Sequence, residues 1–471
     1  MFDLKKRCNY YFNEISKIPR GSKNEKAISD YIVQFAKNHH LKYIQDEVYN
    51  VIVYKEGKEN TDPVLLQSHM DMVCEKNRDV EHDFFKDSLD LYEEEGYLRA
   101  RETTLGADDG VGVAYMLAIL EDTSFLHPPL ECVFTVDEEE GMTGIEHLDV
   151  SNLKSKRMIG LDNTEQGSTY ICAAGGTSVE IKKEMTTISN QKPTYSLSVK
   201  GLLGGHSAVC IQKGRTNANK LMGRVLYHLL PLGIHLVQIT GGMKFNAIPR
   251  ECFVTFCSDA SFEKLKDVVY KIQRELKQEY SLSEPDIQLD LHLVQTSPTC
   301  FDIKSSKEYI LMLYLLRNGC IERMATKESM PSLSLNLGIV QTEKNVISIT
   351  YLIRSSLCSN RYELANELKE IAACFNAAYK IFGDYAGWDY DPQSKIRKQL
   401  KVYYQKHTNQ EYLEEATHGG LEIGLLKGKI PDLDVVTFGA EIIDYHTPNE
   451  RMNIQSFEMC YELLKGFLQT L

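Results

Sequence analysis

The sequence lacks the features that mark membrane-spanning, secreted and disulfide-stabilised proteins. Its longest purely apolar run covers only residues 309–316, far short of the ~18 residues typical of a membrane span. The N-terminal stretch has no apolar segment followed by a small-residue cleavage site, so we expect no secretory signal. The twelve cysteines are scattered without C-x-x-C spacing, which argues against a thiolate zinc motif and a disulfide framework. We therefore expect a cytoplasmic protein with reduced thiols and no membrane partner.

A surplus of positive charge is also missing. Lys and Arg number 53 against 66 Asp and Glu, which gives a net charge of −13. A dedicated nucleic-acid binder carries a basic face, so we expect no nucleic-acid partner. The chain has no repeats or Gly/Ser linkers, and its 43% hydrophobic and 25% charged residues are typical of globular proteins. Its 471 residues predict two or three domains.

The spacing of apolar residues predicts an α/β arrangement in both end regions of the chain. Near the N-terminus it predicts helices at 24–35 and 110–120, and strands at 51–54, 63–67, 130–136 and 158–161. Near the C-terminus it predicts helices at 394–406, 421–427 and 454–468, and a strand at 434–438. Strands interleaved with helices favour a largely parallel sheet.

The pattern changes after about residue 176. Here it predicts strands at 195–199, 251–258, 287–294, 332–339 and 346–353, and helices at 218–230, 262–280, 307–318 and 362–382. We therefore predict a discontinuous α/β catalytic domain, residues 1–175 and 388–471, with a mainly parallel mixed sheet flanked by helices. Residues 176–387 are predicted to form an inserted α+β domain.

Acidic residues and a histidine follow the ends of the predicted N-terminal strands. They are His69 and Asp71 after one strand, Asp108 and Asp109 on a Gly-flanked turn at a helix start, the acidic run 137–140, and Asp162. In open α/β sheets, sites form outside the carboxyl ends of the strands. We therefore expect these side chains to meet along one edge of the sheet.

Such a cluster predicts a metal site. Several carboxylates in one cleft repel one another unless a cation neutralises them, and His nitrogen with carboxylate oxygens suits zinc or a similar divalent ion. The number of donors exceeds what one tetrahedral ion needs, which favours two ions that share a bridging carboxylate. Each element alone has a simpler interpretation: a solvated loop, a helix cap at Asp108 or Asp109, or a turn at Asp162. Their occurrence in order, each after a short apolar strand, favours the metal site.

Six segments of the chain together resemble the cocatalytic di-zinc exopeptidases, which include dipeptidases, tripeptidases, aminoacylases and a carboxypeptidase. The segments are SHMDMV, LGADDGVGVAYML, DEEEGMTG, LDNTEQG, GLLGGHSA and YHTPNE. Four further segments are most similar to the aminoacyl-histidine dipeptidase branch (Xaa-His dipeptidase, carnosinase-like), namely EKNRDVEHDF, KGRTNANKLMGR, NAIPRE and THGGLEIGLL. The likeness covers nearly the whole chain, with its motifs in the expected order.

The resemblance implies a complete two-metal site, with Zn²⁺ as the expected ion and Mn²⁺ or Co²⁺ as alternatives. The implied ligands are His69 and Asp162 for one ion, Glu139 and His446 for the other, and Asp108 as the bridge. Asp71 is expected to orient His69. A cis peptide is expected between Asp108 and the next residue, which is Asp109 where related enzymes often have Asn. In the acidic run, Gly141 anchors the family pattern D-E-E-x-G, so Glu138 is the implied general base.

Residues 176–387 resemble the lid and dimerisation domain of the same superfamily. His206 matches a histidine that stabilises the developing oxyanion, and in many dimeric relatives this histidine comes from the partner subunit. Asn246 and Arg354 match residues that contact substrate, and a guanidinium can bind both oxygens of a dipeptide carboxylate. His418 lies in a stretch that resembles a substrate-side loop, and it has a structural role as its alternative. The resemblance also implies a homodimer.

The function implied by the resemblance is metal-dependent hydrolysis of small unblocked dipeptides, including those with C-terminal His such as β-Ala-His. Two metal ions are expected to activate a water, whose proton Glu138 accepts and passes to the leaving amine. Fold and metal site do not decide the substrate, so tripeptide and N-acyl amino acid hydrolysis are alternatives. A non-catalytic binding protein is a further alternative, against which the presence of His69 and Glu138 argues.

Overall fold

The computed structural model describes residues 2–325 and 330–471. The chain divides into two compact units. Unit 1 comprises Met1–Ile171, Tyr390–Glu415 and Leu425–Leu471, and unit 2 comprises Cys172–Asp389 and Ala416–Gly424. Residues 416–424, which we expected in the catalytic part, therefore group with unit 2.

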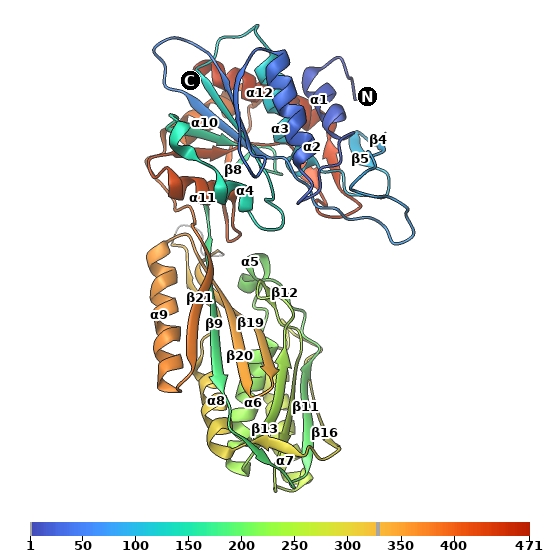
Figure 1. Ribbon diagram of the computed structural model, residues 1–471, viewed down its shortest axis with the longest axis vertical. Coiled ribbons are helices and arrows are strands. Elements are labelled where there is room, and N and C mark those ends of the chain that lie inside the picture. Colours follow the sequence, from blue (N-terminus) through green and yellow to red (C-terminus); the bar gives the residue numbers. More distant parts are fainter. Residues whose placement is uncertain (1, 326–329) are drawn as a thin grey trace. The chain divides into compact units, whose positions relative to one another are not determined.

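Unit 1 is built from both end regions of the chain (Figure 1). Its helices are α1 (Arg7–Ile15), α2 (Lys26–Asn38), α3 (Ala107–Glu121), α4 (Thr143–His147), α10 (Lys395–Thr408) and α12 (Ile454–Thr470). Its strands are β1 (Lys42–Gln45), β2 (Val51–Lys55), β3 (Val64–His69), β4 (Leu91–Glu94), β5 (Tyr97–Ala100), β6 (Leu130–Thr135), β7 (Arg157–Gly160), β23 (Asp434–Thr437), β24 (Ile442–Ile443) and β25 (Arg451–Asn453). The chain passes between the units at four points: within β8 (Ser168–Ala173), between Asp389 and Tyr390, within β22 (Leu413–Thr417) and within α11 (Glu422–Lys429).

The main sheet of unit 1 has the strand order β1-β2-β6-β3-β7-β23. The four strands β6, β3, β7 and β23 are parallel, and β1 and β2 are antiparallel additions at one edge. This arrangement confirms the predicted mainly parallel mixed sheet. Every residue of β3 and β6 is buried, as expected of strands that are covered on both faces.

Helix α3 packs directly against β3, and its buried residues run without a break from Asp109 to Leu120. A helix that is apolar all round is typical of a protein interior. Gly112 permits the close approach, because a Cβ atom there would lie 2.7 Å from both Leu161 Cβ and Ser68 Oγ. The sequence of small residues in this helix thus brings its N-terminal end close to the end of β3.

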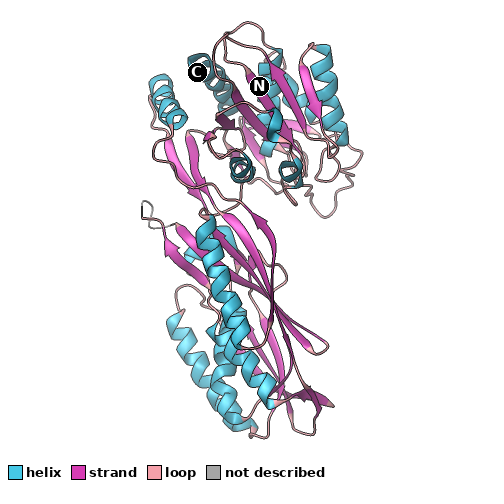
Figure 2. Cartoon of the chain, turned by 60° about the vertical axis from the view of Figure 1, so that its left-hand side comes forward, coloured by secondary structure: helices cyan, strands magenta, loops and turns pink. Residues whose placement is uncertain are grey.

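Unit 2 contains a large antiparallel sheet with the strand order β16-β11-β15-β13-β19-β20-β9-β21, with β18 paired to β19. Its strands are β9 (Gly175–Glu184), β10 (Thr187–Ser189), β11 (Thr194–Lys200), β12 (Gly205–His206), β13 (His235–Gly241), β14 (Ala247–Ile248), β15 (Cys252–Cys257), β16 (Gln288–Val294), β17 (Thr299–Phe301), β18 (Gly319–Arg323), β19 (Pro331–Glu343), β20 (Val346–Ser355) and β21 (Ala378–Tyr385). Its helices are α5 (Ser207–Cys210), α6 (Ala218–Leu229), α7 (Phe262–Glu279), α8 (Ile303–Leu315) and α9 (Cys358–Cys374). The four longer helices gather along one side of the sheet (Figure 2).

Helix α7 illustrates why these helices form. Its buried residues Leu265, Val269, Ile272 and Leu276 repeat at helical spacing and face the core of unit 2. The helix begins after Ser261, whose hydroxyl accepts the backbone N–H of Lys264. An apolar stripe with a cap at its start therefore explains this element from local sequence.

The predicted helix at 362–382 is wrong in its second half. Helix α9 ends at Cys374, and β21 follows as the edge strand beside β9. The turn between them uses Asn376 at a φ of 49°, a left-handed conformation that Asn tolerates better than most residues. Neither Gly nor Pro marks this turn, so the sequence pattern shows no break between the helix and the strand.

Two lysines donate hydrogen bonds to carbonyl groups at helix C-termini, which have no partner within the helix. Lys55 is buried and donates to the carbonyl oxygens of Ile119 at 2.6 Å and Asp122 at 2.5 Å, at the end of α3. Lys220 donates in the same way to the last carbonyls of α8, including that of Leu313 at 3.3 Å. A cation is favoured at a helix C-terminus, where the last carbonyls lack partners within the helix.

Among the described residues, no helix combines the length and the apolar composition needed to cross a membrane.

Candidate metal centre

The carboxyl ends of β3, β6 and β7 lie side by side because these strands are parallel neighbours. His69 is the last residue of β3, the acidic run follows β6, and Asp162 comes two residues after β7. The backbone N–H of Leu161 donates to the carbonyl of Gln67 at 2.8 Å, which continues the pairing toward Asp162. The structure thus places the acids and the histidine at one edge of the sheet, as the sequence predicts.

Asp108 lies between two histidines. Its Oδ1 is 3.2 Å from Nε2 of His69, and its Oδ2 is 3.2 Å from Nε2 of His446. Nε2 of His446 also lies 2.9 Å from Oε1 of Glu139. Each carboxylate oxygen of Asp108 therefore faces a different histidine.

Three overlapping groups of side chains offer metal-ligating atoms that lie within 4.8 Å of one another. The groups are His69, Asp108 and Asp162; Asp108, Glu139 and His446; and His69, Glu138 and Glu139. All five side chains predicted as ligands, and the predicted base Glu138, are brought together in unit 1. The first two groups share Asp108, which is the arrangement that two ions with a bridging carboxylate need.

Asp71 contacts both His69 and the backbone of the acidic run. It is fully buried, and its Oδ1 lies 3.4 Å from Nδ1 of His69. The same carboxylate accepts the backbone N–H groups of Glu138 at 3.1 Å and Glu139 at 3.2 Å, and the hydroxyl of Ser22 at 2.7 Å. One buried side chain therefore fixes the ring of His69 and the backbone of the acidic run, an arrangement typical of residues behind a metal ligand.

The backbone at Asp108 has the geometry that the resemblance implies. The peptide bond between Asp108 and Asp109 is cis. Asp109 does not join any of the three donor groups. Its Oδ1 instead accepts the N–H of Gly112 at 3.0 Å, the bond of a helix cap. The capping alternative therefore describes Asp109, whereas Asp108 faces the histidines.

The ionisation of the cluster shows how strongly its charges interact. Burial, followed by the negative charge of Asp108, raises the pKa of Asp162 to about 7. Burial also raises the pKa of Glu139. For His446, burial acts in the opposite direction, but the hydrogen bonds to Asp108 and Glu139 raise its pKa to about 10. Carboxylates withdrawn from water retain protons unless a positive charge compensates them, so the cluster suits divalent cations, and its N and O donors fit zinc.

The predicted oxyanion residue His206 and the three residues predicted to bind substrate, Asn246, Arg354 and His418, all belong to unit 2. His206 is in β12 and pairs with Ala247 of β14, and the N–H of the following Ser207 donates to the carbonyl of Asn246 at 2.9 Å. Nε of Arg354 lies 3.4 Å from Oγ of Ser207. Burial lowers the pKa of His206, and the charge of Arg354 lowers it further.

His418 is held close to the same arginine. Its side chain is 3% exposed, and its Nε2 lies 2.7 Å from Oγ of Ser334, which pairs with Arg354 across β19 and β20. Burial, followed by the charge of Arg354, lowers the pKa of His418 to about 3. This histidine is therefore neutral at physiological pH, and substrate contact by it stays a prediction. Nη1 of Arg354 donates to the hydroxyl of Tyr385 at 2.9 Å, a partner that the sequence did not indicate.

Residues 65–470 match the peptidase family M20/M25/M40. The chain belongs to this family. It is 35% identical to the cytosol non-specific dipeptidase of Escherichia coli K12 over 467 residues, which cover 97% of this chain and 96% of the relative. The resemblance inferred from the motifs and the predicted enzyme class, a metal-dependent peptide hydrolase, are thereby confirmed.

Solved structures of M20 peptidases show the same fold. The crystal structure of the aminoacylhistidine dipeptidase from Vibrio alginolyticus is similar with a TM-score of 0.91 and 34% identity, over 99% of this chain and 96% of that one. A tripeptidase from Staphylococcus aureus has a TM-score of 0.60 at 15% identity, over 99% of this chain and 98% of that one, and this likeness concerns the fold alone. The predicted α/β fold with an inserted α+β part is therefore confirmed.

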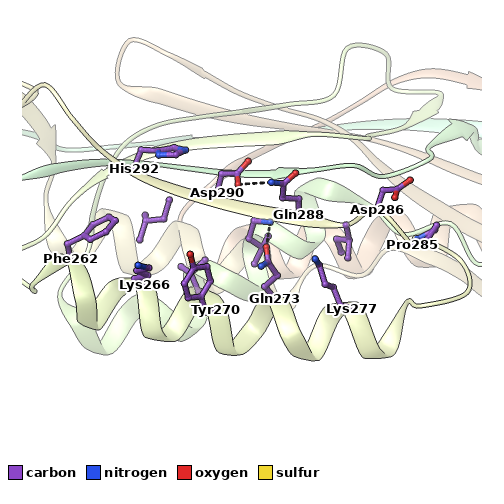
Figure 3. A pocket seen from close by; sticks show the side chains of 14 residues that line it. Phe262, Lys266, Tyr270, Gln273, Lys277, Pro285, Asp286, Gln288, Asp290 and His292 are labelled. Carbon is purple, nitrogen blue, oxygen red and sulfur yellow. Dashed lines mark hydrogen bonds between the residues drawn. The ribbon is translucent and has the colours of Figure 1, made fainter.

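This M20 peptidase has a further pocket in unit 2, between helix α7 and strand β16 (Figure 3). Tyr270 and Lys266 reach it from the helix, and Asp290 and His292 from the strand. Oε1 of Gln273 accepts the N–H of Leu289 at 2.6 Å and ties the helix to the strand. None of the site residues predicted from the sequence lines this pocket.

Proposed function

We propose that the chain is a metal-dependent dipeptidase that hydrolyses unblocked dipeptides, including those with C-terminal His such as β-Ala-His. The observation that carries the proposal is the pair of donor sets that share Asp108, in a chain of the M20 family. The identity to a non-specific dipeptidase and to an aminoacylhistidine dipeptidase, each over nearly the whole chain, supports dipeptides as the substrate class.

The donor sets assign the metal ligands within this proposal. His69, Asp108 and Asp162 hold one ion, and Asp108, Glu139 and His446 hold the other. We expect Zn²⁺ at both positions because His nitrogen and carboxylate oxygen are its usual donors, with Mn²⁺ and Co²⁺ as alternatives. When bound, the two ions supply a water of lowered pKa and positive charge for the developing oxyanion.

Glu138 is the proposed general base. An oxygen of its carboxylate lies within 4.8 Å of the ligand atoms of His69 and Glu139. Its backbone N–H donates a hydrogen bond to Oδ1 of Asp71 at 3.1 Å. From this position the carboxylate accepts the proton of the nucleophilic water and then delivers it to the leaving amine. In unit 2, His206 is assigned to the oxyanion and Arg354 to the free carboxylate of the substrate, with Asn246 and His418 as further substrate contacts.

We further propose a cytoplasmic homodimer. All twelve cysteines are free thiols, which suits a reducing compartment. In the dimer, His206 acts either in its own subunit or on the partner. Mixing the Glu138→Ala and His206→Ala variants distinguishes the two, because heterodimers regain intact sites only if His206 acts across the dimer. A mixture without recovered turnover assigns His206 to its own subunit.

The test of the function is hydrolysis of a peptide panel by metal-reconstituted protein. The panel contains β-Ala-His, Gly-His, Leu-Gly and Cys-Gly, with Gly-Gly-Gly and N-acetyl-Met as outgroups, each with and without chelator. We expect chelator-sensitive cleavage of the free dipeptides only. Preferential cleavage of the tripeptide or the acylated amino acid would overturn the dipeptidase proposal.

The Glu138→Ala variant tests the assigned base with the same panel. It should keep its metal content and lose at least ~10²-fold in kcat, the lower range for an acid–base residue. Near-normal turnover in this variant would refute the role of Glu138.

A further inference from the structure

The loops that carry the metal donors have backbone groups that neither the sheet nor the helices can satisfy. Met70 and Asp71 follow β3, and residues 105–108 precede the regular part of α3. Buried N–H and C=O groups need partners. Two buried side chains of opposite charge, Arg20 and Glu450, supply them.

Arg20 joins the two loops. Its side chain is 2% exposed. Nη1 donates to the carbonyls of Met70 at 3.0 Å and Asp71 at 3.1 Å, and Nη2 donates to the carbonyl of Gly106 at 2.5 Å. A single planar guanidinium therefore fixes the loop after His69 relative to the loop before Asp108, which a lysine ammonium cannot do with the same geometry.

Two glycines make room for this guanidinium. A Cβ atom at Gly106 would lie 2.6 Å from Nη2 of Arg20, and a Cβ atom at Gly110 would lie 2.7 Å from it. Gly106 also has a φ of 64°, which disfavours other residues. The absence of side chains at the glycines that flank Asp108 and Asp109 therefore leaves the space that the guanidinium of Arg20 occupies.

Glu450 binds the same loop through its N–H groups. The side chain is 2% exposed, and its Oε2 accepts from Leu105 at 2.7 Å and Gly106 at 2.9 Å. Its Oε1 accepts from Ala107 at 2.8 Å and Asp108 at 3.4 Å. Glu450 follows the ligand His446 by four residues, so one short segment supplies both a metal donor and the residue that holds the bridging aspartate.

We propose that Arg20 and Glu450 are positioning residues of the two-metal site. This inference rests on the proposed function. In the loop before Asp108, Arg20 holds the carbonyl of Gly106 and Glu450 holds the N–H groups, so the two together fix the direction of the Asp108 carboxylate. Because Asp108 faces both histidines at 3.2 Å, displacement of this loop weakens both donor sets at once.

The experiment measures metal binding by the metal-free full-length protein. Zn²⁺ is titrated in competition with a chromophoric chelator, and the thermal midpoint of the metal-free protein is recorded in parallel. We expect two ions per chain in the unchanged protein. In Glu450→Gln and in Arg20→Lys we expect both ions to bind about 10- to 100-fold more weakly, the range found when residues behind metal ligands are changed.

Glu131→Gln is the matched control. Glu131 is 4% exposed, and its carboxylate also accepts backbone N–H groups, those of Lys154 at 2.9 Å and Ser155 at 3.0 Å. It lies on β6 at the end of the strand away from the acidic run. This control should bind both ions as the unchanged protein does, even where its thermal midpoint falls.

Two results would overturn the positioning role. One is unchanged affinity for both ions in either variant. The other is a loss of Zn²⁺ affinity in Glu131→Gln that is as large, for the same fall in thermal midpoint, as the loss in Glu450→Gln or Arg20→Lys. If Glu450→Gln does not fold, Arg20→Lys tests the same loop from the carbonyl side. Absence of metal binding by the unchanged protein overturns the proposed function itself.

Discussion

Replacing His418 should change how the stability of unit 2 depends on pH. In the folded protein the pKa of this histidine is about 3, because burial and the charge of Arg354 disfavour the imidazolium. In the unfolded chain it is about 6.5. Acid therefore protonates the unfolded state first, and the free energy of unfolding falls as the pH drops from about 6.5 toward 3.

The magnitude follows from the two pKa values. Below pH 6.5 the loss approaches ~1.4 kcal/mol for each pH unit, so lowering the pH from about 7.5 to 5 costs about 2 kcal/mol. Because pH 5 lies well above the folded pKa, a folded value anywhere below about 4 gives the same figure. In His418→Gln this loss disappears, since the amide stays neutral while still offering a partner to Ser334.

The assay is urea unfolding followed by the fluorescence of Trp388. This residue is the one tryptophan of the sequence, is 3% exposed and belongs to unit 2, as His418 does. The signal therefore reports the unit that contains the substitution. Other titrating groups are common to both proteins, so they cancel in the difference between the protein and His418→Gln.

The difference in the free energy of unfolding between the protein and His418→Gln should change by about 2 kcal/mol between about pH 7.5 and pH 5. His292→Gln, which removes an exposed histidine of the same unit, shows what the loss of a solvated imidazole does. A difference between the protein and His418→Gln that stays constant within ~0.5 kcal/mol would mean that His418 takes up protons as readily in the folded state as in the unfolded one.

Three further predictions concern stability. Gly112→Ala should destabilise the protein by about 1–3 kcal/mol in calorimetry, because the added Cβ meets Leu161 and Ser68 at 2.7 Å; the gain of up to ~1 kcal/mol usual for Gly to Ala in a helix would contradict the close packing. Lys220→Met should cost about 1–3 kcal/mol in the Trp388 assay, since it removes the donor for the last carbonyls of α8, and an unchanged urea midpoint would show that water replaces the ammonium. Adding Zn²⁺ to metal-free protein at ~100 times its Kd should raise the free energy of unfolding by about 2.7 kcal/mol for each of the two ions bound; a calorimetric midpoint that does not move would argue against a metal site in the folded state.

The residues of the candidate metal centre could be predicted because they follow local patterns. His69, the acidic run and Asp162 each come just after a short apolar strand, and parallel strands place such residues at one edge. Asp108 stands in a distinctive Gly-flanked turn. His446 has no such local signal and could be assigned only through the resemblance of its segment.

Arg20 and Glu450 could not be predicted in the same way. Arg20 contacts residues 50 to 86 positions away, and Glu450 contacts residues more than 340 positions away. Nothing in the spacing of nearby residues reveals such contacts. The break between α9 and β21 was missed for a different reason, because Asn376 ends the helix in a conformation that the sequence signals only weakly.

The division of unit 1 between the two end regions of the chain has a consequence for synthesis. His69, Asp108 and Asp162 have all been made once about a third of the chain has left the ribosome, whereas His446 follows only after the whole of unit 2. A growing chain therefore has the donors of one set and lacks the histidine of the other, together with β23 and α12. If both sets are needed for hydrolysis, the chain is inactive until the segment with His446 has been made and has folded into unit 1, and proteolytic removal of that segment abolishes the activity.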